Sequence, residues 1–169
     1  DNNVNDLVFT SSDKAVHPAN TMGATKLVGE KLFSAGNVHR GGRDITFSSV
    51  RFGNVLGSSR SVVPIFKKQI KEEGKIKLTS KEMTRFFLTF DQVTDLVTGA
   101  LENAEGGEIF LKKMKAIRIE DLAEAMIDLY APEYGRDPED VEIEIIGKRP
   151  GETFHEHTMT RREADRALE

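Results

Sequence analysis

The sequence predicts an α/β fold in which strands and helices alternate along the chain. Short apolar runs that suit buried strands are followed by longer segments whose apolar residues recur at helical spacing. Short turns separate these segments, and no internal repeat or long linker divides the chain into independent units. At 169 residues the chain is long enough for one domain with a sizeable core or for part of a larger domain, and we favour the second interpretation.

The first predicted strand covers residues 7–10 and leads into a loop at Ser12. A helix is expected over residues 21–35, with Asn20 as its N-cap and Gly36 as its end. The residues expected on the core-facing side of this helix are Ala24, Leu27, Val28, Leu32 and Ala35.

A second strand is expected over residues 45–52, and the loop that follows it is rich in glycine and serine, which suits a close approach of the backbone to another group. The next helix, over residues 62–73, tolerates Pro64 in its first turn and ends at Gly74. The remaining predicted elements are a helix capped by Asp91, a strand over 108–111, a helix over 119–130, a strand over 141–146 and a last helix over 161–168.

The composition narrows the classes of function. Charged residues make up 31% of the chain and the formal net charge is −4, so nothing indicates binding to a nucleic-acid backbone. The chain has no cysteine, which excludes disulfides and thiolate chemistry and agrees with a reducing compartment. Because the sequence also has no membrane-length apolar run and no signal-peptide pattern, we expect a cytoplasmic protein without a membrane segment.

A candidate site lies where the first strand meets the first helix. Asp13 and Lys14 are expected on a loop at the carboxyl end of a strand, where ligands bind in open α/β sheets. Met22 and Lys26 are four residues apart and therefore share one face of the helix, pointing back toward Ser12. The spacing alone is equally compatible with a capped loop, an ion pair that fixes it and a solvated lysine.

Four motifs in order resemble those of a known family. Residues 11–26 resemble the active-site segment of the polysaccharide-biosynthesis nucleotide-sugar dehydratases, the inverting UDP-N-acetylglucosamine 4,6-dehydratase group of the extended short-chain dehydrogenase/reductases. The later motifs are VRFGNVLGSS at 50–59, MTRFF at 83–87 and RPGE at 149–152. The resemblance covers almost the whole chain but only the C-terminal half of such an enzyme.

This resemblance implies the C-terminal part of a Rossmann-like parallel-sheet fold plus a small α/β substrate-binding portion. Residues 1–60 would belong to the Rossmann-like domain and carry the active-site segment, and residues 61–169 would form mainly the substrate-binding portion, interleaved with the Rossmann-like layer. The implied cofactor is NAD(P), and most of its pocket would lie outside this chain because the sequence has no GxGxxG fingerprint. A missing N-terminal half or a partner subunit would supply the rest, and a homo-oligomer is a further expectation.

The resemblance also implies roles in catalysis. Lys26 would hydrogen-bond the nicotinamide ribose, and Ser12 would position the 4-hydroxyl of a UDP-sugar during oxidation at carbon 4. Lys14 would then remove the proton on carbon 5, and Asp13 would protonate the departing carbon 6 hydroxyl before hydride returns to carbon 6. Met22 stands where the superfamily usually has a tyrosine, and a thioether cannot take a proton. The base for the 4-hydroxyl is therefore Asp13, Lys14 or a water relayed by Ser12.

Substrate binding is expected from four further residues. By the family pattern, Asn54 would contact the diphosphate or the adjoining backbone, Arg149 the phosphates and Glu152 a ribose hydroxyl of uridine. Arg85 is a further candidate for the diphosphate, because a guanidinium binds phosphate through two parallel hydrogen bonds.

Two alternatives to the dehydratase remain at the level of the sequence. A nucleotide-sugar epimerase of the same superfamily is disfavoured, because such enzymes generally keep the tyrosine and lack the Asp13–Lys14 pair. A non-catalytic remnant that binds a UDP-sugar or a partner would bind the nucleotide without turnover. A metal site at His155 and His157 is not expected, because residues two apart point in different directions on a helix and no third ligand has supportive spacing.

Overall fold

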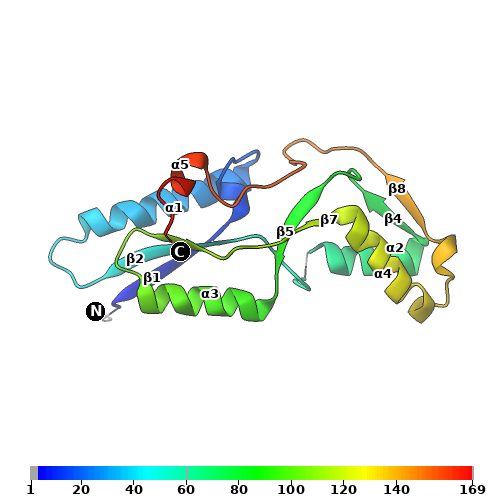
Figure 1. Cartoon of the computed structure of the whole chain (residues 1–169), viewed down its shortest axis with the longest axis horizontal. Helices are drawn as coiled ribbons and strands as arrows, with labels where there is room; N and C mark the ends of the chain where they lie inside the picture. Colours follow the sequence, from blue (N-terminus) through cyan, green and yellow to red (C-terminus); the bar gives the residue numbers. More distant parts are fainter. Residues whose placement is uncertain (1–3, 60, 169) are drawn as a thin grey trace. The chain divides into compact units, whose positions relative to one another are not determined.

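The computed structural model describes residues 4–59 and 61–168, and these form two compact units (Figure 1). Unit 1 comprises the residues up to Gly53, Leu88–Met114 and the residues from Glu156 onward. Unit 2 comprises Asn54–Phe87 and Lys115–His155. Both units combine helices with strands, so the predicted α/β class is confirmed.

Unit 1 is built around a parallel sheet with strand order β1-β2-β6. β1 (Asp6–Ser12) and β6 (Ile109–Leu111) flank β2 (Thr46–Phe52), the central strand. The helices α1 (Thr21–His39) and α3 (Phe90–Asn103) lie on opposite faces of this sheet (Figure 1). Neighbouring parallel strands need a crossover connection of this kind, usually a helix. Among the described strands, β1 lies at an edge of this sheet.

The start of α1 confirms the predicted cap, whereas its end does not follow the prediction. The Asn20 side chain accepts a hydrogen bond from the Gly23 amide at 3.0 Å. The helix continues past Gly36 to His39. A Cβ at Gly36 would lie 3.1 Å from the Phe47 ring, so this glycine serves close packing against the sheet and does not end the helix.

The predicted core-facing side of α1 is wrong. Val28 and Leu32 are 57% and 65% exposed, and Ala24 and Ala35 are exposed as well. α1 instead turns its glycines toward the sheet, where a Cβ at Gly29 would come within 2.3 Å of the Phe9 ring. Backbone packed against aromatic rings brings the helix closer to the sheet than a leucine or valine face allows.

Two other predicted helix ends also differ. α3 begins at Phe90 and its N-cap is Thr89 instead of Asp91, because Thr89 and Gln92 exchange the two hydrogen bonds of a capping box. α5 is a single turn, Arg161–Ala164, where a longer helix is predicted.

Unit 2 pairs two helices with two small sheets. α2 (Val62–Glu73) holds Pro64 in its first turn and ends at Gly74, as predicted, with Gly74 in the left-handed conformation at φ 66°. It packs against α4 (Ile119–Tyr130). The strands β4 (Lys75–Leu78) and β8 (Glu142–Ile145) form a parallel pair.

The second sheet of unit 2 has the order β3-β5-β7 and carries parts of two predicted motifs, 50–59 and 83–87. Its strands are β3 (Asn54–Val55), β5 (Thr84–Leu88) and β7 (Ala116–Arg118), and β5 runs antiparallel to β7. Short 3-10 turns, η2 (Pro132–Tyr134) and η3 (Pro138–Asp140), lead from α4 to β8.

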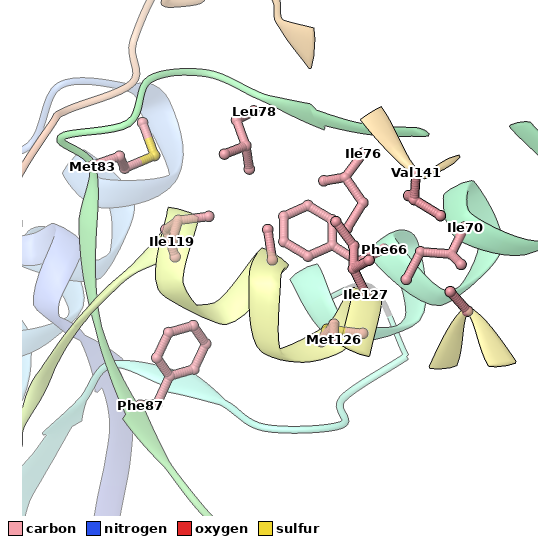
Figure 2. Close-up of a cluster of buried hydrophobic side chains, with 12 residues drawn as sticks. Phe66, Ile70, Ile76, Leu78, Met83, Phe87, Ile119, Met126, Ile127 and Val141 are labelled. Carbon is pink, nitrogen blue, oxygen red and sulfur yellow. The ribbon is translucent and has the colours of Figure 1, made fainter. Parts of the chain in front are cut away.

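The apolar core of unit 2 lies between its helices and the β4–β8 pair (Figure 2). Phe66 of α2 is only 3% exposed, and Ile76 of β4 and Ala123 of α4 are fully buried. The buried members of this core are Phe66, Ile70, Ile76, Leu78, Met83, Phe87, Ile119, Ala123, Met126, Ile127, Ala131 and Val141.

We expect Phe66→Ala to lower the free energy of unfolding by about 3–5 kcal/mol, because it removes a buried ring and leaves a cavity. Phe90→Ala is the matched control, since Phe90 is 61% exposed, and we expect a change below about 1 kcal/mol. Urea titration followed by circular dichroism measures both. Equal losses for the two variants would contradict this description of the core.

Candidate functional site

Ser12, Asp13 and Lys14 form a continuous chain of polar contacts where β1 ends. The Ser12 hydroxyl donates to Asp13 Oδ1 at 2.8 Å, and Lys14 Nζ donates to the same oxygen at 3.0 Å. The Ser12 Oγ also accepts from the Lys14 amide at 3.4 Å and so caps the 3-10 turn η1 (Asp13–Ala15). One carboxylate oxygen thus links a hydroxyl to an amine.

Asp13 is buried although it carries a carboxylate. The residue is 1% exposed, whereas the Lys14 side chain reaches solvent. Asp13 Oδ2 is also buried and has no hydrogen-bond partner in the described part of the chain. Buried polar atoms are normally satisfied, so this second oxygen is an exception among the described residues.

The first turn of α1 lies directly against this loop. A Cβ at Gly23 would come within 2.4 Å of the Lys14 carbonyl oxygen, so only glycine fits there without moving the loop backbone. Met22 is the neighbouring residue and its side chain is exposed. The structure therefore brings the start of the predicted Met22–Lys26 segment to the Ser12–Lys14 loop.

Among the described residues, Lys26 forms a hydrogen bond with β1 and not with the carboxylate of Asp13. Its Nζ donates to the Thr10 carbonyl at 2.8 Å and lies 5.1 Å from the centre of the Phe9 ring. An ammonium group has further N–H donors, so Lys26 can hold Thr10 and donate to a ribose hydroxyl at the same time. Lys26 is therefore suited to contact the ribose of NAD(P). The glycine fingerprint that would bind the pyrophosphate of NAD(P) is not in the sequence.

The guanidinium of Arg85 is engaged by backbone carbonyl groups of unit 2. Its Nη1 donates to Thr84 at 2.7 Å and to Phe154 at 3.1 Å, and its Nη2 donates to Thr153 at 2.8 Å. Arg85 therefore anchors the segment that follows the RPGE motif. Its predicted contact with a diphosphate stays a prediction.

The RPGE motif forms a turn held by its own glutamate. Glu152 Oε2 accepts from the Arg149 amide at 3.1 Å and from Thr79 Oγ1 at 3.3 Å, and the Arg149 side chain is exposed. Asn54 opens β3, in the same sheet as the strand that carries Arg85. The four predicted substrate residues thus all belong to unit 2, and the predicted catalytic residues all belong to unit 1.

Arg51 is a buried residue that the sequence analysis missed. It lies in the central strand β2, is 2% exposed, and forms a bidentate pair with Glu30 of α1, with contacts of 3.0 and 2.7 Å. It also donates to both carboxylate oxygens of Glu163 and to the Thr158 carbonyl at 2.9 Å. Two signals were available: a charged residue inside a strand of otherwise uncharged residues, and a glutamate one turn after Lys26.

This cluster shifts two pKa values. Burial by itself would lower the pKa of Arg51, but the hydrogen bonds and charges of Glu30 and Glu163 outweigh burial and raise it. Burial would likewise raise the pKa of Glu163, but the bonds from Arg51 and the Thr160 amide lower it from 4.5 to about 2. Arg51 and Glu163 are therefore both charged at neutral pH.

His155 and His157 lie in a loop. His155 Nδ1 is 2.9 Å from Thr84 Oγ1, and the His157 ring meets the His17 ring edge-on with centroids 5.4 Å apart. Within residues 4–59 and 61–168 no group of three or more His, Cys, Asp or Glu residues could hold a metal ion. No helix in the same part of the chain is long and apolar enough to cross a membrane.

The parallel sheet with helices on both faces and a polar loop at the carboxyl end of β1 define the C-terminal part of a Rossmann-type α/β enzyme fold. The solved structure of Pen from Bacillus thuringiensis matches 95% of this chain and 49% of its own, with a TM-score of 0.90 and 46% sequence identity. The dTDP-glucose 4,6-dehydratase DesIV from Streptomyces venezuelae, solved with NAD and TYD bound, matches 96% of this chain and 53% of its own with a TM-score of 0.74. At 16% identity that second likeness shows the fold alone.

The chain belongs to the polysaccharide biosynthesis protein family, whose model matches residues 1–169, so the predicted resemblance is confirmed. An uncharacterized membrane protein of Methanocaldococcus jannaschii, MJ1061, is 48% identical over 96% of this chain and 49% of that protein.

Two relatives with named activities are also similar. The UDP-N-acetylglucosamine 4,6-dehydratase (inverting) of Campylobacter jejuni is 41% identical over 92% of this chain and 44% of that protein. The UDP-glucose 4-epimerase of Rickettsia rickettsii is 36% identical over 98% of this chain and 47% of that protein. The chain therefore spans about half the length of these relatives.

We expect Gly23→Ala to displace the Ser12–Lys14 loop and to lower the free energy of unfolding by about 1–3 kcal/mol, because the new methyl group overlaps the Lys14 carbonyl. The control is Gly99→Ala in α3, where no atom lies within 4 Å of the added Cβ, so alanine stabilises the helix by up to about 1 kcal/mol. Opposite signs in urea unfolding, with Lys14 amide shifts only in the Gly23 variant, are the expected result. A neutral Gly23→Ala contradicts the close contact.

Stability is expected to fall as the pH drops from about 4.5 toward 2. The pKa of Glu163 is lower in the folded chain than its usual 4.5, so the folded state binds its proton less readily. The stabilisation is therefore present above pH 4.5 and is lost as Glu163 becomes protonated near pH 2. Unfolding measured between these limits should depend less on pH in Glu163→Gln than in the exposed control Asp165→Asn. Identical slopes would contradict the assignment to Glu163.

Proposed function

We propose that this chain is the catalytic and substrate-binding half of an NAD(P)-dependent nucleotide-sugar 4,6-dehydratase. The substrate would be UDP-N-acetylglucosamine or a related UDP-sugar used in the biosynthesis of a surface polysaccharide or glycan. The observation that carries the proposal is the Ser12–Asp13–Lys14 chain, in which a buried carboxylate oxygen accepts bonds from a hydroxyl and an amine. An acid and a base side by side are what the elimination of water requires.

The cofactor half of the site is proposed to come from residues outside this sequence. When bound, NAD(P) would accept a hydride from carbon 4 and later return it to carbon 6. Lys26 would hold the nicotinamide ribose while keeping its bond to the Thr10 carbonyl. The edge of β1 that β2 leaves open is suited to pairing with a further parallel strand.

The hydrogen bonds of the loop offer a proton path that needs no tyrosine. With Met22 unable to accept a proton, the 4-hydroxyl would release its proton to Ser12 Oγ as Ser12 passes its own proton to Asp13 Oδ1, 2.8 Å away. Asp13 would then be protonated, which is the state that the next step requires.

The elimination step follows from the same pair. Lys14 would take the proton from carbon 5, and the protonated Asp13 would give its proton to the hydroxyl leaving carbon 6, which departs as water. Once carbon 6 has received hydride, Lys14 would return its proton to carbon 5. Asp13 therefore gains one proton and loses one, Lys14 does the same, and the substrate loses one water.

The nucleotide is proposed to bind through unit 2. Arg149 has an exposed guanidinium for the diphosphate, and Asn54 would add an amide contact to it. Glu152 would accept from a ribose hydroxyl while its Oε2 holds the RPGE turn. Arg85 would act on the diphosphate or through the carbonyl groups that it holds at Thr153 and Phe154.

A second candidate is a UDP-sugar 4-epimerase, because a relative of that name is 36% identical over 98% of this chain. Product analysis in deuterated water separates the two functions. A dehydratase product is lighter by one water and carries deuterium at carbon 5, because the Lys14 ammonium exchanges its protons with solvent before one of them returns to carbon 5. An epimerase product has the mass of the substrate and no deuterium. UDP-sugar binding without any product, with the cofactor half present, would overturn both and favour a binding remnant.

In the same assay we expect Lys14→Ala to lower kcat for dehydration by about 10²–10⁴, because the base for the carbon 5 proton is lost. Lys31→Ala is the control, since Lys31 is an exposed lysine of α1 and takes no part in the proposed reaction. Dehydration at an unchanged rate in Lys14→Ala would remove Lys14 from the mechanism.

A further inference from the structure

We infer that Arg51 is a positioning residue whose hydrogen bonds hold the C-terminal segment of unit 1 in place. His157 of that segment then restricts the Ser12–Lys14 loop through its contact with His17. We call the first interaction the latch and the second the brace. The latch segment is Glu156–Ala164, which contains Thr158 and Glu163, two of the three partners of Arg51. The effect on turnover rests on the proposed function, whereas the latch itself does not.

Arg51 has no spare donor with which to hold anything else. Its Nε donates to Glu30, its Nη1 to Thr158 and Glu163, and its Nη2 to Glu30 and Glu163, so every N–H direction of the guanidinium is used. The Arg51 side chain is 2% exposed and that of Glu30 is fully buried. Removing one partner of a buried charge is costly, so the three partners are held in one arrangement.

The bonds between Arg51 and Glu30 hold α1, the helix that carries Lys26. α1 packs Gly29 and Gly36 against aromatic rings of the sheet and turns Val28 and Leu32 outward. The ring of Phe33 secures the far half of the helix against Phe9. Nearer the candidate site, the polar anchors are the Glu30–Arg51 pair and the Lys26–Thr10 bond.

The bond between Arg51 and Glu163 acts on the loop through His157 and His17. A capping box between Thr160 and Glu163 shapes the latch segment, and the Arg51 bond to the Thr158 carbonyl fixes the residue next to His157. The His157 ring then meets His17 at an interplanar angle of 88°. His17 directly follows Val16, whose amide donates to the Asp13 carbonyl at 3.1 Å and closes η1. Arg51 is thus connected to Asp13 through contacts that all lie within unit 1.

The test compares Glu163→Gln with Asp165→Asn, an equal change of charge two residues away at an exposed position. Glu163→Gln should shift the NMR signals of the His17 ring and of the η1 amides, and should speed exchange of the Val16 amide about tenfold, because the latch opens more often. Asp165→Asn should change signals in α5 only. Unchanged His17 and Val16 signals in Glu163→Gln, recorded well below its unfolding midpoint, would overturn the latch.

A second variant separates a local effect on the loop from a general loss of stability. His157→Ala removes an exposed ring but leaves every bond of Arg51 in place, so we expect the same shifts at His17 and η1 with no change in the unfolding midpoint. Signals at η1 that respond to neither variant would overturn the brace. Because these readouts need no substrate, they remain valid if the dehydratase assignment fails, and loss of turnover with intact η1 signals would point away from the latch.

Discussion

The structure of unit 1 depends on one buried cation. Arg51 stands in the central strand of the sheet and is paired with Glu30 from the helix above it and with Glu163 from the end of the chain. A buried charge of this kind contributes little net stability, but it admits few alternative arrangements because each alternative leaves an ion without a partner. Together with the two hydrogen bonds that the Asn37 side chain exchanges with the Phe47 backbone, it fixes the place of α1 on the sheet.

The local sequence pattern was enough to predict the order of the helices and strands and the position of the loop at the end of β1. The Asn20 cap, the end of α2 at Gly74 and the alternation of strands with helices are all encoded by neighbouring residues. The side of α1 that is buried is not encoded locally. The apolar residues Val28 and Leu32 suggested one side, but aromatic rings on the sheet selected the glycine side, and those rings come from other parts of the chain.

The same distinction applies to the candidate site. The sequence placed Ser12, Asp13 and Lys14 together because they are adjacent, and the structure adds which atoms bond and how deeply Asp13 is buried. Arg51 escaped notice because its partners lie 21 and 112 residues away in the sequence, a separation that no periodicity reports. Chemistry carried by consecutive residues was therefore predictable, and chemistry assembled from distant segments was not.

The interleaving of the two units has a consequence for biosynthesis. The chain crosses between them after Gly53, Phe87, Met114 and His155, so unit 2 is complete while unit 1 still lacks its last segment. On a ribosome, Glu30 and Arg51 emerge before unit 2, and Glu163 emerges after it. The central charge of unit 1 is therefore only partly neutralised until Glu163 has emerged, and chaperone binding to the nascent chain should be prolonged at this sheet while unit 2 is already folded.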